Sequence, residues 1–553
     1  MLGKLIERLS GRAGRRKTAA LQLTSEATDL FGAGDLPAAL SKITEAVACQ
    51  SDCALALQMQ GTILSALGQS ERALASFYAA LEVDRKSASL HLDFGNASRM
   101  AGDLESAEVR YRQALELEPG FELAWKSLGT LLLDMQRPVE AAAVFSRALE
   151  ITPEDHESLK NLGKAAFRTY DFELTCKLFR PLYCKKLLDV EACYFLGAAL
   201  LFTGNVDEAG NVLEETIARA PQEAALIQML SYKHLLSGDW LDGFRLYERR
   251  HNAMRSNPEH PGLKTWIDFI DTALAGVPAW TDGGCAGKRL LIWAEQGLGD
   301  TIMMLRLLPV LRKEWGAAAI TFLCTSSLKA LQDGCESAHF IAATASWKAQ
   351  PGEFDGHCSI MSLPYLMRIA PDSIPGAVPY IHVPAAMRQH WRDTVQILPG
   401  LRVGLVWAGN PGLLLDSLRS IPLDKLKPLL LCAGASFVSL QKDDAAREEL
   451  KTSGMLISDW MDQCGNFMET AALIDNLDLV ISVDTAVVHL AGALGKPVWL
   501  LNRFESDWRW MRGREDSLWY PSVRIFSQTE SRKWDLVISK AAAALNELSA
   551  ARG

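Results

Sequence analysis

The feature that most constrains the fold is a 34-residue period that runs through the first half of the chain. Small residues recur at this spacing, and large aromatic residues recur at the same spacing in a second register. The glycine positions are Gly61, Gly95, Gly129, Gly163 and Gly197, and the aromatic positions are Phe77, Tyr111, Phe145 and Phe179. Such a period indicates a stack of one repeated structural unit rather than a single globular core.

The repeated unit has the pattern of a tetratricopeptide repeat, a helix–turn–helix in which small residues let the two helices approach closely. Seven units beginning near residues 20, 54, 88, 122, 156, 190 and 224 predict a superhelix over residues 20–257, after a basic segment at residues 1–19. The concave face of such a superhelix suits an extended peptide or a helix of a protein partner. An array that serves only as a rigid spacer or an oligomer interface is the alternative.

The overall composition excludes several classes of protein. With 49% hydrophobic and 22% charged residues and a net charge of -9, the chain has no general basic field for nucleic acid or an anionic membrane. No run approaches the roughly 18 apolar residues of a transmembrane segment. The basic N-terminus lacks the apolar core of a signal peptide, so we expect a cytoplasmic protein. This basic start is either an ordinary first helix or a segment that touches a membrane surface.

The 11 cysteines agree with that compartment. Their number is odd and their positions are scattered, which favours a reducing environment. Cys49 and Cys53 are spaced C-x-x-x-C but have no His or Cys partner nearby in the sequence. No metal site is therefore predicted.

The second half has a different organisation, after a segment at residues 258–285 that is rich in Pro, Gly and Trp and is interpreted as a linker. Apolar runs of strand length then alternate with helical segments, which predicts parallel sheets covered by helices. The expected strands are 289–294, 319–324, 378–383, 402–408, 436–441, 479–483, 497–501 and 523–526. We expect two Rossmann-like domains, 286–395 and 396–553, the second ending in a C-terminal helix, with a ligand between them.

The first of these domains opens with a glycine loop. Gly297 and Gly299 follow the first predicted strand and precede a helix that begins near Asp300. The loop lacks the G-x-G-x-x-G spacing of a dinucleotide site and the lysine of a P-loop. Asp300 is either an N-cap of the helix or a carboxylate with a chemical role.

The second domain carries polar residues after its first predicted strand. Asn410 follows that strand, and Asp416, Arg419 and Ser420 come next along the chain. A guanidinium beside a hydroxyl and backbone donors would suit a diphosphate. A solvated Arg419 and a Ser420 that only caps a helix are the alternative.

A strand-to-helix corner at residues 479–502 completes the pattern. Asp484 and Thr485 end a buried strand, and His489 lies on the following helix on the same face as Thr485. Asp484 could cap the helix and still accept a hydrogen bond from a sugar hydroxyl, whereas a lone His489 is usually a packed residue. The later Trp-rich segment at 505–526 is either a cradle for a nucleobase and phosphate or a packed loop.

Several stretches of the second half resemble the bacterial tetratricopeptide-repeat glycosyltransferases. Those proteins join repeats to a GT-B fold related to the heptosyltransferases and, in architecture, to the protein O-linked N-acetylglucosamine transferases. The resemblance spans nearly the whole chain. The stretches are AEQGLGDT (294–301), GLVWAGNP (404–411), RSIPL (419–423), FVSLQ (437–441), DLVISVDTAVVHLAGALGKPVWLL (478–501) and DWRWMRGREDSLWYPSVRIF (507–526).

The resemblance implies transfer of a sugar from a nucleotide-diphosphate donor to an acceptor hydroxyl, with inversion and without a metal or other cofactor. Asp300, after Gly297 and Gly299, would be the general base, and the repeats would present a protein acceptor. The residues that it places around the donor are Asn410, Arg419, Ser420, Gln441, Asp484, Thr485, Ala486 and His489.

This chain departs from the family pattern between Pro411 and Arg419, where it reads GLLLDSL. The expected histidine is absent, and Ser417 stands where arginine is common. A catalytically silent scaffold is therefore the main alternative, and a glycosyltransferase with a lipid or glycan acceptor is a third possibility.

Overall fold

The computed structural model describes residues 2–256, 261–281, 284–413 and 415–551. The chain divides into two compact units, Met1–Ala199 and Leu200–Gly553. Parts of the predicted regions lie outside the described residues: residue 1 of the basic segment, 257 of the superhelix, 258–260 and 282–283 of the linker, Leu414 of the loop between Pro411 and Arg419, and 552–553 of the second domain.

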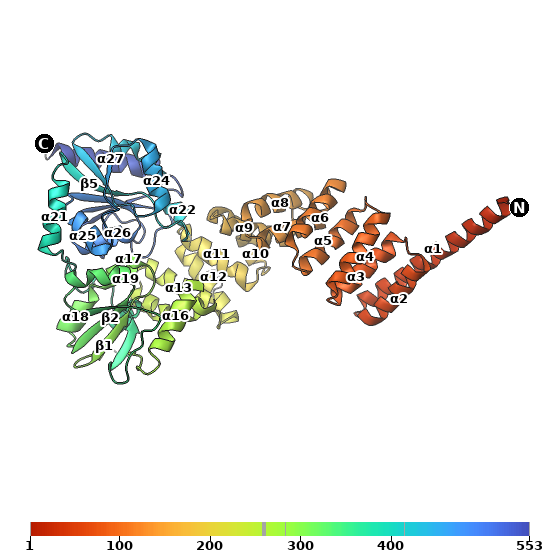
Figure 1. The fold of residues 1–553 in the computed structure, drawn as a ribbon, viewed down its shortest axis with the longest axis horizontal. Coiled ribbons are helices and arrows are strands. Elements are labelled where there is room, and N and C mark those ends of the chain that lie inside the picture. The colour runs from red at the N-terminus through yellow and green to blue at the C-terminus, as the bar shows by residue number, and fades with distance from the viewer. Residues whose placement is uncertain (1, 257–260, 282–283, 414, 552–553) are drawn as a thin grey trace. The chain divides into compact units, whose positions relative to one another are not determined.

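The first unit is an array of helix pairs, as the 34-residue period predicts (Figure 1). Helices begin at Ala54, Ala88, Glu122, His156 and Val190, the predicted repeat starts. The first helix begins at Leu2 and therefore runs through the basic segment 1–19. The helices are α1 (Leu2–Gly32), α2 (Leu36–Cys49), α3 (Ala54–Ala66), α4 (Ser70–Val83), α5 (Ala88–Met100), α6 (Leu104–Leu117), α7 (Glu122–Asp134), α8 (Pro138–Ile151), α9 (His156–Arg168) and α10 (Phe172–Cys184), with α11 (Val190–Phe202) crossing the boundary of the unit.

The glycine and aromatic columns explain the packing within each pair. A Cβ atom added at Gly61 would lie 2.7 Å from the Phe77 ring, and one at Gly129 would lie 2.6 Å from the Phe145 ring. Both rings are fully buried. The glycines are therefore present because the partner helix approaches too closely for a side chain.

The turns within the pairs carry a recurring glycine and aspartate. Gly34 and Gly102 both have φ of 82°, a left-handed conformation that favours glycine. The following Asp35 and Asp103 accept hydrogen bonds from backbone N–H groups in the first turn of the next helix. The repeat pattern thus fixes the end of one helix and the start of the next.

The second unit begins with the last repeats and then departs from the predicted linker. Its first helices are α12 (Val206–Arg219), α13 (Ala224–Leu236), α14 (Trp240–Tyr247), α15 (Arg250–Ser256) and α16 (Pro261–Ala273). Helix α16 lies within the segment 258–285 that the sequence indicated as a linker. Its Ile267 and Ile270 pack against Leu291 and Trp293 of the first sheet, because apolar residues recur there at helical spacing.

The first α/β domain contains a four-stranded parallel sheet in the order β3-β2-β1-β4. Its strands are β1 (Arg289–Trp293), β2 (Ala319–Cys324), β3 (His339–Ala342) and β4 (Gly356–Ser359). Its helices include α17 (Leu298–Met304), α18 (Leu307–Lys313), α19 (Ser326–Lys329), α20 (Leu363–Leu366) and the 3-10 turns η1 (Ala330–Gly334) and η2 (Ile360–Ser362). The expected strand at 378–383 is wrong, because the N–H groups of Tyr380 and His382 donate to Ala493 and Gly334 at helix ends.

The second α/β domain contains a six-stranded parallel sheet in the order β10-β9-β8-β5-β6-β7. Its strands are β5 (Leu401–Val406), β6 (Ala435–Ser439), β7 (Ile457–Asp459), β8 (Leu479–Val483), β9 (Val498–Asn502) and β10 (Val523–Ser527). Its helices are α21 (Ala385–Val395), α22 (Asp416–Arg419), η3 (Leu423–Leu426), α23 (Lys427–Leu430), α24 (Asp444–Ser453), α25 (Phe467–Asp475), α26 (Ala486–Ala493) and α27 (Asp535–Ala550). The two sheets with their covering helices match the expected GT-B architecture.

The second domain begins earlier than residue 396. Helix α21 packs on α25, where the indole N–H of Trp391 donates to Glu469 at 3.1 Å and Arg388 pairs with Asp475. Trp391 is fully buried. This helix therefore belongs to the core of the second domain, although the sequence placed it at the end of the first.

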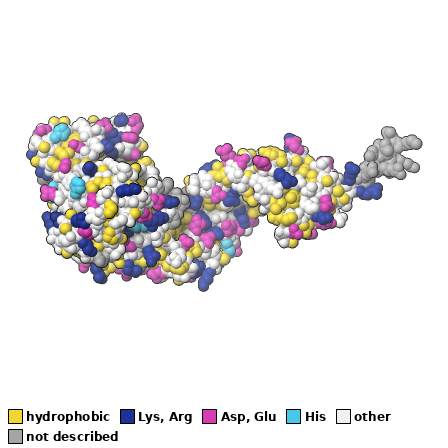
Figure 2. All heavy atoms as spheres, turned by 60° about the horizontal axis from the view of Figure 1, so that its bottom comes forward, with side chains coloured by type: hydrophobic (Ala, Val, Ile, Leu, Met, Phe, Trp, Pro, Cys, Tyr) yellow, Lys and Arg dark blue, Asp and Glu magenta, His cyan; other side chains and the backbone are white. Residues whose placement is uncertain are grey.

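The surface shows both signs of charge. On the face drawn in Figure 2, Lys and Arg side chains are interspersed with Asp and Glu side chains and with apolar ones. This distribution agrees with the absence of a general basic field in the composition.

Candidate functional site

The predicted glycine loop and the predicted corner lie side by side in the second unit. The loop after β1 leads into α17, the corner after β8 leads into α26, and α17 packs against α26. A Cβ atom at Gly299 would lie 2.6 Å from Cδ2 of His489 and 3.4 Å from Cα of Ala486. Gly299 is thus required by the close approach of the other domain. The carboxyl ends of β1 and β8 form the candidate site, as expected for parallel sheets.

Asp300 is the third residue of α17 rather than its N-cap. Its Oδ2 accepts a hydrogen bond of 3.1 Å from the N–H of Gly297, which is the N-cap residue. Its other oxygen pairs with the guanidinium of Arg509. Burial and the nearby Asp507 and Asp484 raise the pKa of Asp300, although Arg509 and the Gly297 N–H oppose that shift. Asp300 is therefore a more basic carboxylate than an exposed aspartate.

His489 is buried between the two domains. Its Nδ1 lies 3.1 Å from the hydroxyl of Tyr520, and its ring lies 5.2 Å from the ring of Trp510. Burial lowers the pKa of His489 to about 4, so the ring is neutral at physiological pH. His489 thus has one hydrogen bond and one ring contact with neighbouring side chains, and a role of His489 in donor binding stays a prediction.

Arg419 joins the loop after β5 to the corner after β8. Its Nε donates to Asp416 at 2.8 Å, and its Nη1 donates to the backbone oxygen of Asp484 at 3.0 Å. The hydroxyl of Ser420 donates to the other oxygen of Asp416 at 2.8 Å and accepts from the N–H of Gly409 at 2.9 Å. Ser420 therefore follows the short helix α22 instead of capping the start of a helix. These contacts bring Asp416, Arg419, Ser420 and Asp484 together.

Three further predicted residues have local partners. Asn410 accepts a hydrogen bond of 2.9 Å from the N–H of Gly412 within an exposed turn. Gln441 is buried, and its amide bonds the backbone of residues 407 and 408 at the end of β5. The hydroxyl of Thr485 lies 3.2 Å from that of Ser482. Gln441 therefore stabilises the backbone at the end of β5, a contact that sequence spacing could not reveal.

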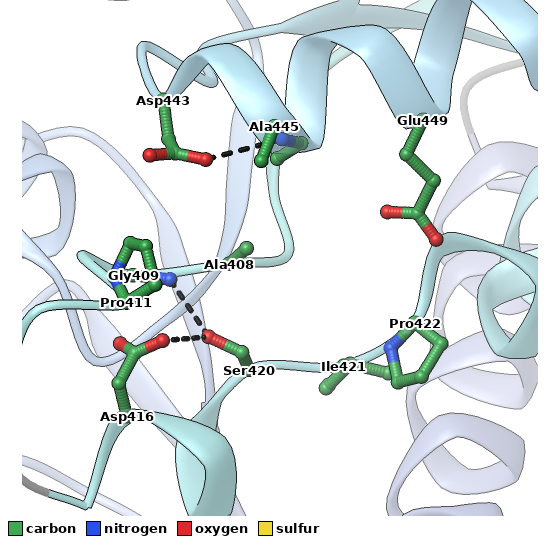
Figure 3. Close-up of a pocket in the computed structure, with 11 residues that line it drawn as sticks. Ala408, Gly409, Pro411, Asp416, Ser420, Ile421, Pro422, Asp443, Ala445 and Glu449 are labelled. Carbon is green, nitrogen blue, oxygen red and sulfur yellow. Dashed lines mark hydrogen bonds between the residues drawn. The ribbon is translucent and has the colours of Figure 1, made fainter.

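A cavity of about 400 Å³ lies at the carboxyl ends of β5 and β6 (Figure 3). Asp416 and Ser420 lie on one side of it, and the start of α24 lies on the other. Asp443 caps α24, and Glu449 accepts from the indole of Trp407 and from the N–H of Leu423. The complete lining is Ala408, Gly409, Pro411, Asp416, Ser420, Ile421, Pro422, Asp443, Ala445, Ala446 and Glu449. The sequence analysis did not identify the part of the lining that α24 contributes. The signal for it was Asp443, a helix-capping aspartate that follows a buried strand.

The Trp-rich segment is a packed loop, one of the two interpretations of the sequence. Trp508, Trp510 and Trp519 are at most 1% exposed. Trp240 of the last repeat stacks on Trp519 with ring centroids 5.3 Å apart. The indoles therefore form a core between the last repeat and the second domain.

Arg509 is the site residue whose role sequence reasoning missed. The sequence places it only in the Trp-rich segment, interpreted as either a cradle for a nucleobase and phosphate or a packed loop, whereas the structure pairs it with Asp300 and Asp507. Its partner Asp300 lies far away in the sequence, so no local signal could find the pair.

No cluster of three or more His, Cys, Asp or Glu side chains suited to a metal ion occurs in residues 2–256, 261–281, 284–413 and 415–551. Within those ranges, no helix has the length and hydrophobicity to span a bilayer.

Comparisons with known proteins match both halves of the chain. Residues 460–541 match glycosyltransferase family 9 (heptosyltransferase), and residues 24–90 and 98–166 match tetratricopeptide repeats. The chain is similar to protein FlbA of Caulobacter vibrioides, with 26% identity over 91% of this chain and 98% of that protein. It is also similar to human protein O-mannosyl-transferase TMTC3, with 38% identity over 60 residues, 11% of this chain and 7% of that protein.

The solved structure of pilF from Pseudomonas aeruginosa aligns with a TM-score of 0.35 and 14% identity, over 37% of this chain and 94% of that one. The family 9 match covers Asp484, His489, Asp507 and Arg509 and supports glycosyl transfer. The chain therefore combines tetratricopeptide repeats with a heptosyltransferase-like glycosyltransferase domain. The resemblance of its sequence motifs led us to expect this combination.

Proposed function

We propose that the chain transfers a sugar from a nucleotide-diphosphate donor to an acceptor hydroxyl, with Asp300 as the general base. The observation that carries this proposal is the position of the Asp300 carboxylate beside the Asp484 corner of the segment that matches family 9. The acceptor oxygen forms a bond to the anomeric carbon, its proton passes to Asp300, and the bond from that carbon to the diphosphate oxygen breaks. The raised pKa of Asp300 suits a base that works near neutral pH.

The donor would lie across the ends of β5, β6 and β8. The mostly apolar cavity beside Ser420 has a volume that suits a nucleoside. The first turn of α26, at Thr485 and Ala486, directs N–H groups outward and with Arg419 would stabilise the leaving diphosphate. These donors would supply the charge stabilisation that a divalent metal otherwise provides, so we propose a metal-independent reaction. The single displacement by the acceptor oxygen would invert the configuration at the anomeric carbon.

The acceptor would be a protein held by the repeats. A stack of helix pairs offers an extended surface of the kind that binds peptides. We propose the cytoplasm as the site of the reaction, because an odd number of scattered cysteines favours a reducing compartment.

A catalytically silent scaffold is the second candidate, and one observation favours it. Arg419 already bonds Asp416 and the backbone of Asp484, in a loop whose sequence departs from the family pattern. A diphosphate would have to take over part of these contacts.

The test is to measure the thermal stability of the full chain in the presence of each member of a panel of nucleoside diphosphates and nucleoside-diphosphate sugars. A ligand at 100 times its Kd adds about 2.7 kcal/mol to the stability of the native state. We expect one nucleotide to stabilise the chain and Asp484→Ala to abolish the effect. The matched control is Asp355→Ala, which removes a carboxylate paired with Arg289 at the start of β1.

Asp300→Asn separates binding from chemistry. This variant should keep the stabilisation by the donor and lose sugar transfer, by about 100-fold or more. Full single-turnover transfer in Asp300→Asn would rule out the proposed base. Stabilisation by none of the nucleotides would favour the silent scaffold.

A further inference from the structure

Arg509 lies between two carboxylates deep in the second unit. Its Nη2 pairs with Asp300, and its Nη1 pairs with Asp507 at 2.5 Å. The guanidinium carbon lies 4.5 Å from the centre of the Trp508 ring. Trp508 is itself fixed by edge contacts with Trp240 and Phe244 of α14. The guanidinium is therefore held by its partners and by a buried ring.

Asp507 is anchored as firmly as Arg509. Its Oδ1 accepts from the backbone N–H and the side chain of Arg509, and its Oδ2 accepts from the hydroxyl of Tyr232 at 3.0 Å. Tyr232 belongs to α13, in the last repeat. A chain of hydrogen bonds and ion pairs thus runs from the last repeat through Asp507 and Arg509 to Asp300.

We propose that Arg509 and Asp507 are positioning residues that orient the Asp300 carboxylate and set its proton affinity. This inference rests on the proposed function, because it assigns the control of the same base. The two residues act with opposite sign. The cation of Arg509 favours ionised Asp300, whereas the second anion of Asp507 disfavours it and competes for the same guanidinium.

Other charged or titratable groups also face this pair. Asp484 acts on Asp300 from the corner after β8, and Asp300 in turn acts on Tyr520 and on Tyr247 of α14. His489, which is neutral, faces both Arg509 and Asp507, and the cation Arg503 acts on Asp507. Arg509 is the cation that acts on Asp300 itself and is therefore the dominant favourable charge on that carboxylate.

The test uses the full chain and two readouts. The first is the pH dependence of kcat/KM for sugar transfer with the donor found in the nucleotide panel. The second is the titration of the Asp300 carboxyl in a chain with ¹³C-labelled aspartate, in which Asp300→Asn identifies the signal. The variants are Arg509→Gln and Asp507→Asn. The matched control is Arg514→Gln, which removes an arginine of the same segment that pairs with the exposed Asp516.

Opposite shifts are the expected result. Arg509→Gln should move the Asp300 titration and the acid limb of the pH profile to higher pH by about one unit or more. Asp507→Asn should move both to lower pH, and Arg514→Gln should move neither. A structural disturbance alone would not give opposite signs. Shifts of the same sign, or no shift in either variant, would overturn the proposal.

The proposal can still be tested if Arg509→Gln does not fold or if the wild-type chain transfers no sugar. If Arg509→Gln does not fold, Arg509→Lys replaces it. This variant keeps the charge but cannot bridge both carboxylates, so it should lower kcat with little change in the pKa of Asp300. Asp507→Asn then carries the titration test, and the absence of a shift to lower pH in that variant would overturn the proposal. If the wild-type chain transfers no sugar, the proposed function fails, and the carboxyl titration alone decides whether Arg509 and Asp507 control Asp300.

Discussion

Gly299 is a single residue on which the contact between the two α/β domains depends. A methyl group there would lie 2.6 Å from the ring of His489, which is held by Tyr520 and Trp510 and has little freedom to move. Gly299→Ala should therefore destabilise the chain by about 1–3 kcal/mol, as other overpacked sites do. Urea denaturation measures the change. Gly276→Ala is the control, since a Cβ there meets no atom within 4 Å. Equal stability of the two variants would contradict the close approach.

His489 gives a prediction about pH. The unfolded chain binds a proton at this residue near pH 6.5, but the folded chain does so only near pH 4 because the ring is buried. The unfolded state takes up the proton first, so stability is lost as pH falls from 6.5 towards 4, by up to about 3 kcal/mol.

The check for His489 is urea denaturation at several pH values. His489→Gln keeps a partner for Tyr520 and should lose this part of the pH dependence, whereas His390→Gln, on an exposed face, should retain it. The same pH dependence in all three proteins would show that His489 does not contribute.

Individual site residues were predictable to different degrees. Asp484 could be selected because it directly follows a buried strand, and Asp300 and His489 because they lie in the first turn of the helix after such a strand, where parallel sheets present side chains. The contacts of Arg509 with Asp300, and of Tyr232 with Asp507, join segments far apart in the sequence. Such contacts depend on how the elements pack, and no spacing in one sequence encodes them.

The helix pairs of the first unit depend on the glycine column. Gly129→Ala would place a methyl group 2.6 Å from the buried Phe145 ring. The gain in helix propensity, about 1 kcal/mol, should be exceeded by a packing cost that leaves a net loss of about 1–3 kcal/mol. Urea denaturation followed by circular dichroism measures the loss.

Two comparisons make the Gly129 prediction specific. Gly32→Ala, in α1, meets no atom within 4 Å and should be neutral or stabilising by up to about 1 kcal/mol. Adding Phe145→Leu to Gly129→Ala should recover part of the lost stability, because a smaller side chain makes room for the methyl group. A Gly129→Ala variant as stable as Gly32→Ala would be evidence against close packing in this column.

The elements themselves followed from the sequence where the pattern was long. The period of 34 predicted the helix starts of six repeats, whereas the start expected near residue 20 lies inside α1. Continuous apolar runs predicted seven of the strands. The short strands β3, β4 and β7 were missed, because three or four residues give no clear alternation. The apolar run at 378–383 did not form a strand, because its backbone N–H groups bond to carbonyl oxygens at helix ends. Tertiary packing, which the local pattern does not encode, determines those partners.

The last repeat is joined to the first α/β domain by a buried ion pair. Arg250 of α15 bonds both oxygens of Glu295 at 2.7 and 2.8 Å, and neither side chain is exposed to solvent. Glu295 follows β1 and precedes the glycine loop, and it also contacts His251 and Ser359. Burial alone would raise the pKa of Glu295, but Arg250 and His251 outweigh it and lower that pKa. The end of the repeat array is therefore part of the core that holds the candidate site.

Removing Arg250 tests this connection. Arg250→Met would leave the Glu295 carboxylate buried without its cation, so the free energy of unfolding at pH 7 should fall by about 3–5 kcal/mol. Arg250→Met with Glu295→Leu should recover most of the loss, since the fully buried carboxylate is then gone and the other partner of Arg250, Glu248, is partly exposed. Arg245→Met, which breaks an exposed pair with Asp242 on α14, should change stability by about 0.5 kcal/mol or less.

The pH dependence of the Arg250 variant has a defined sign. In the wild-type chain the lowered pKa of Glu295 contributes stability above the pKa of the unfolded chain, and this contribution is lost as pH falls towards the folded value. In Arg250→Met the carboxyl can take up a proton at higher pH, so the difference in stability from the wild type should narrow as pH decreases. Urea denaturation between pH 7 and pH 4 measures it. A constant difference over that range, or a loss no larger than that of Arg245→Met, would show that the last repeat and the glycine loop are not coupled through this pair.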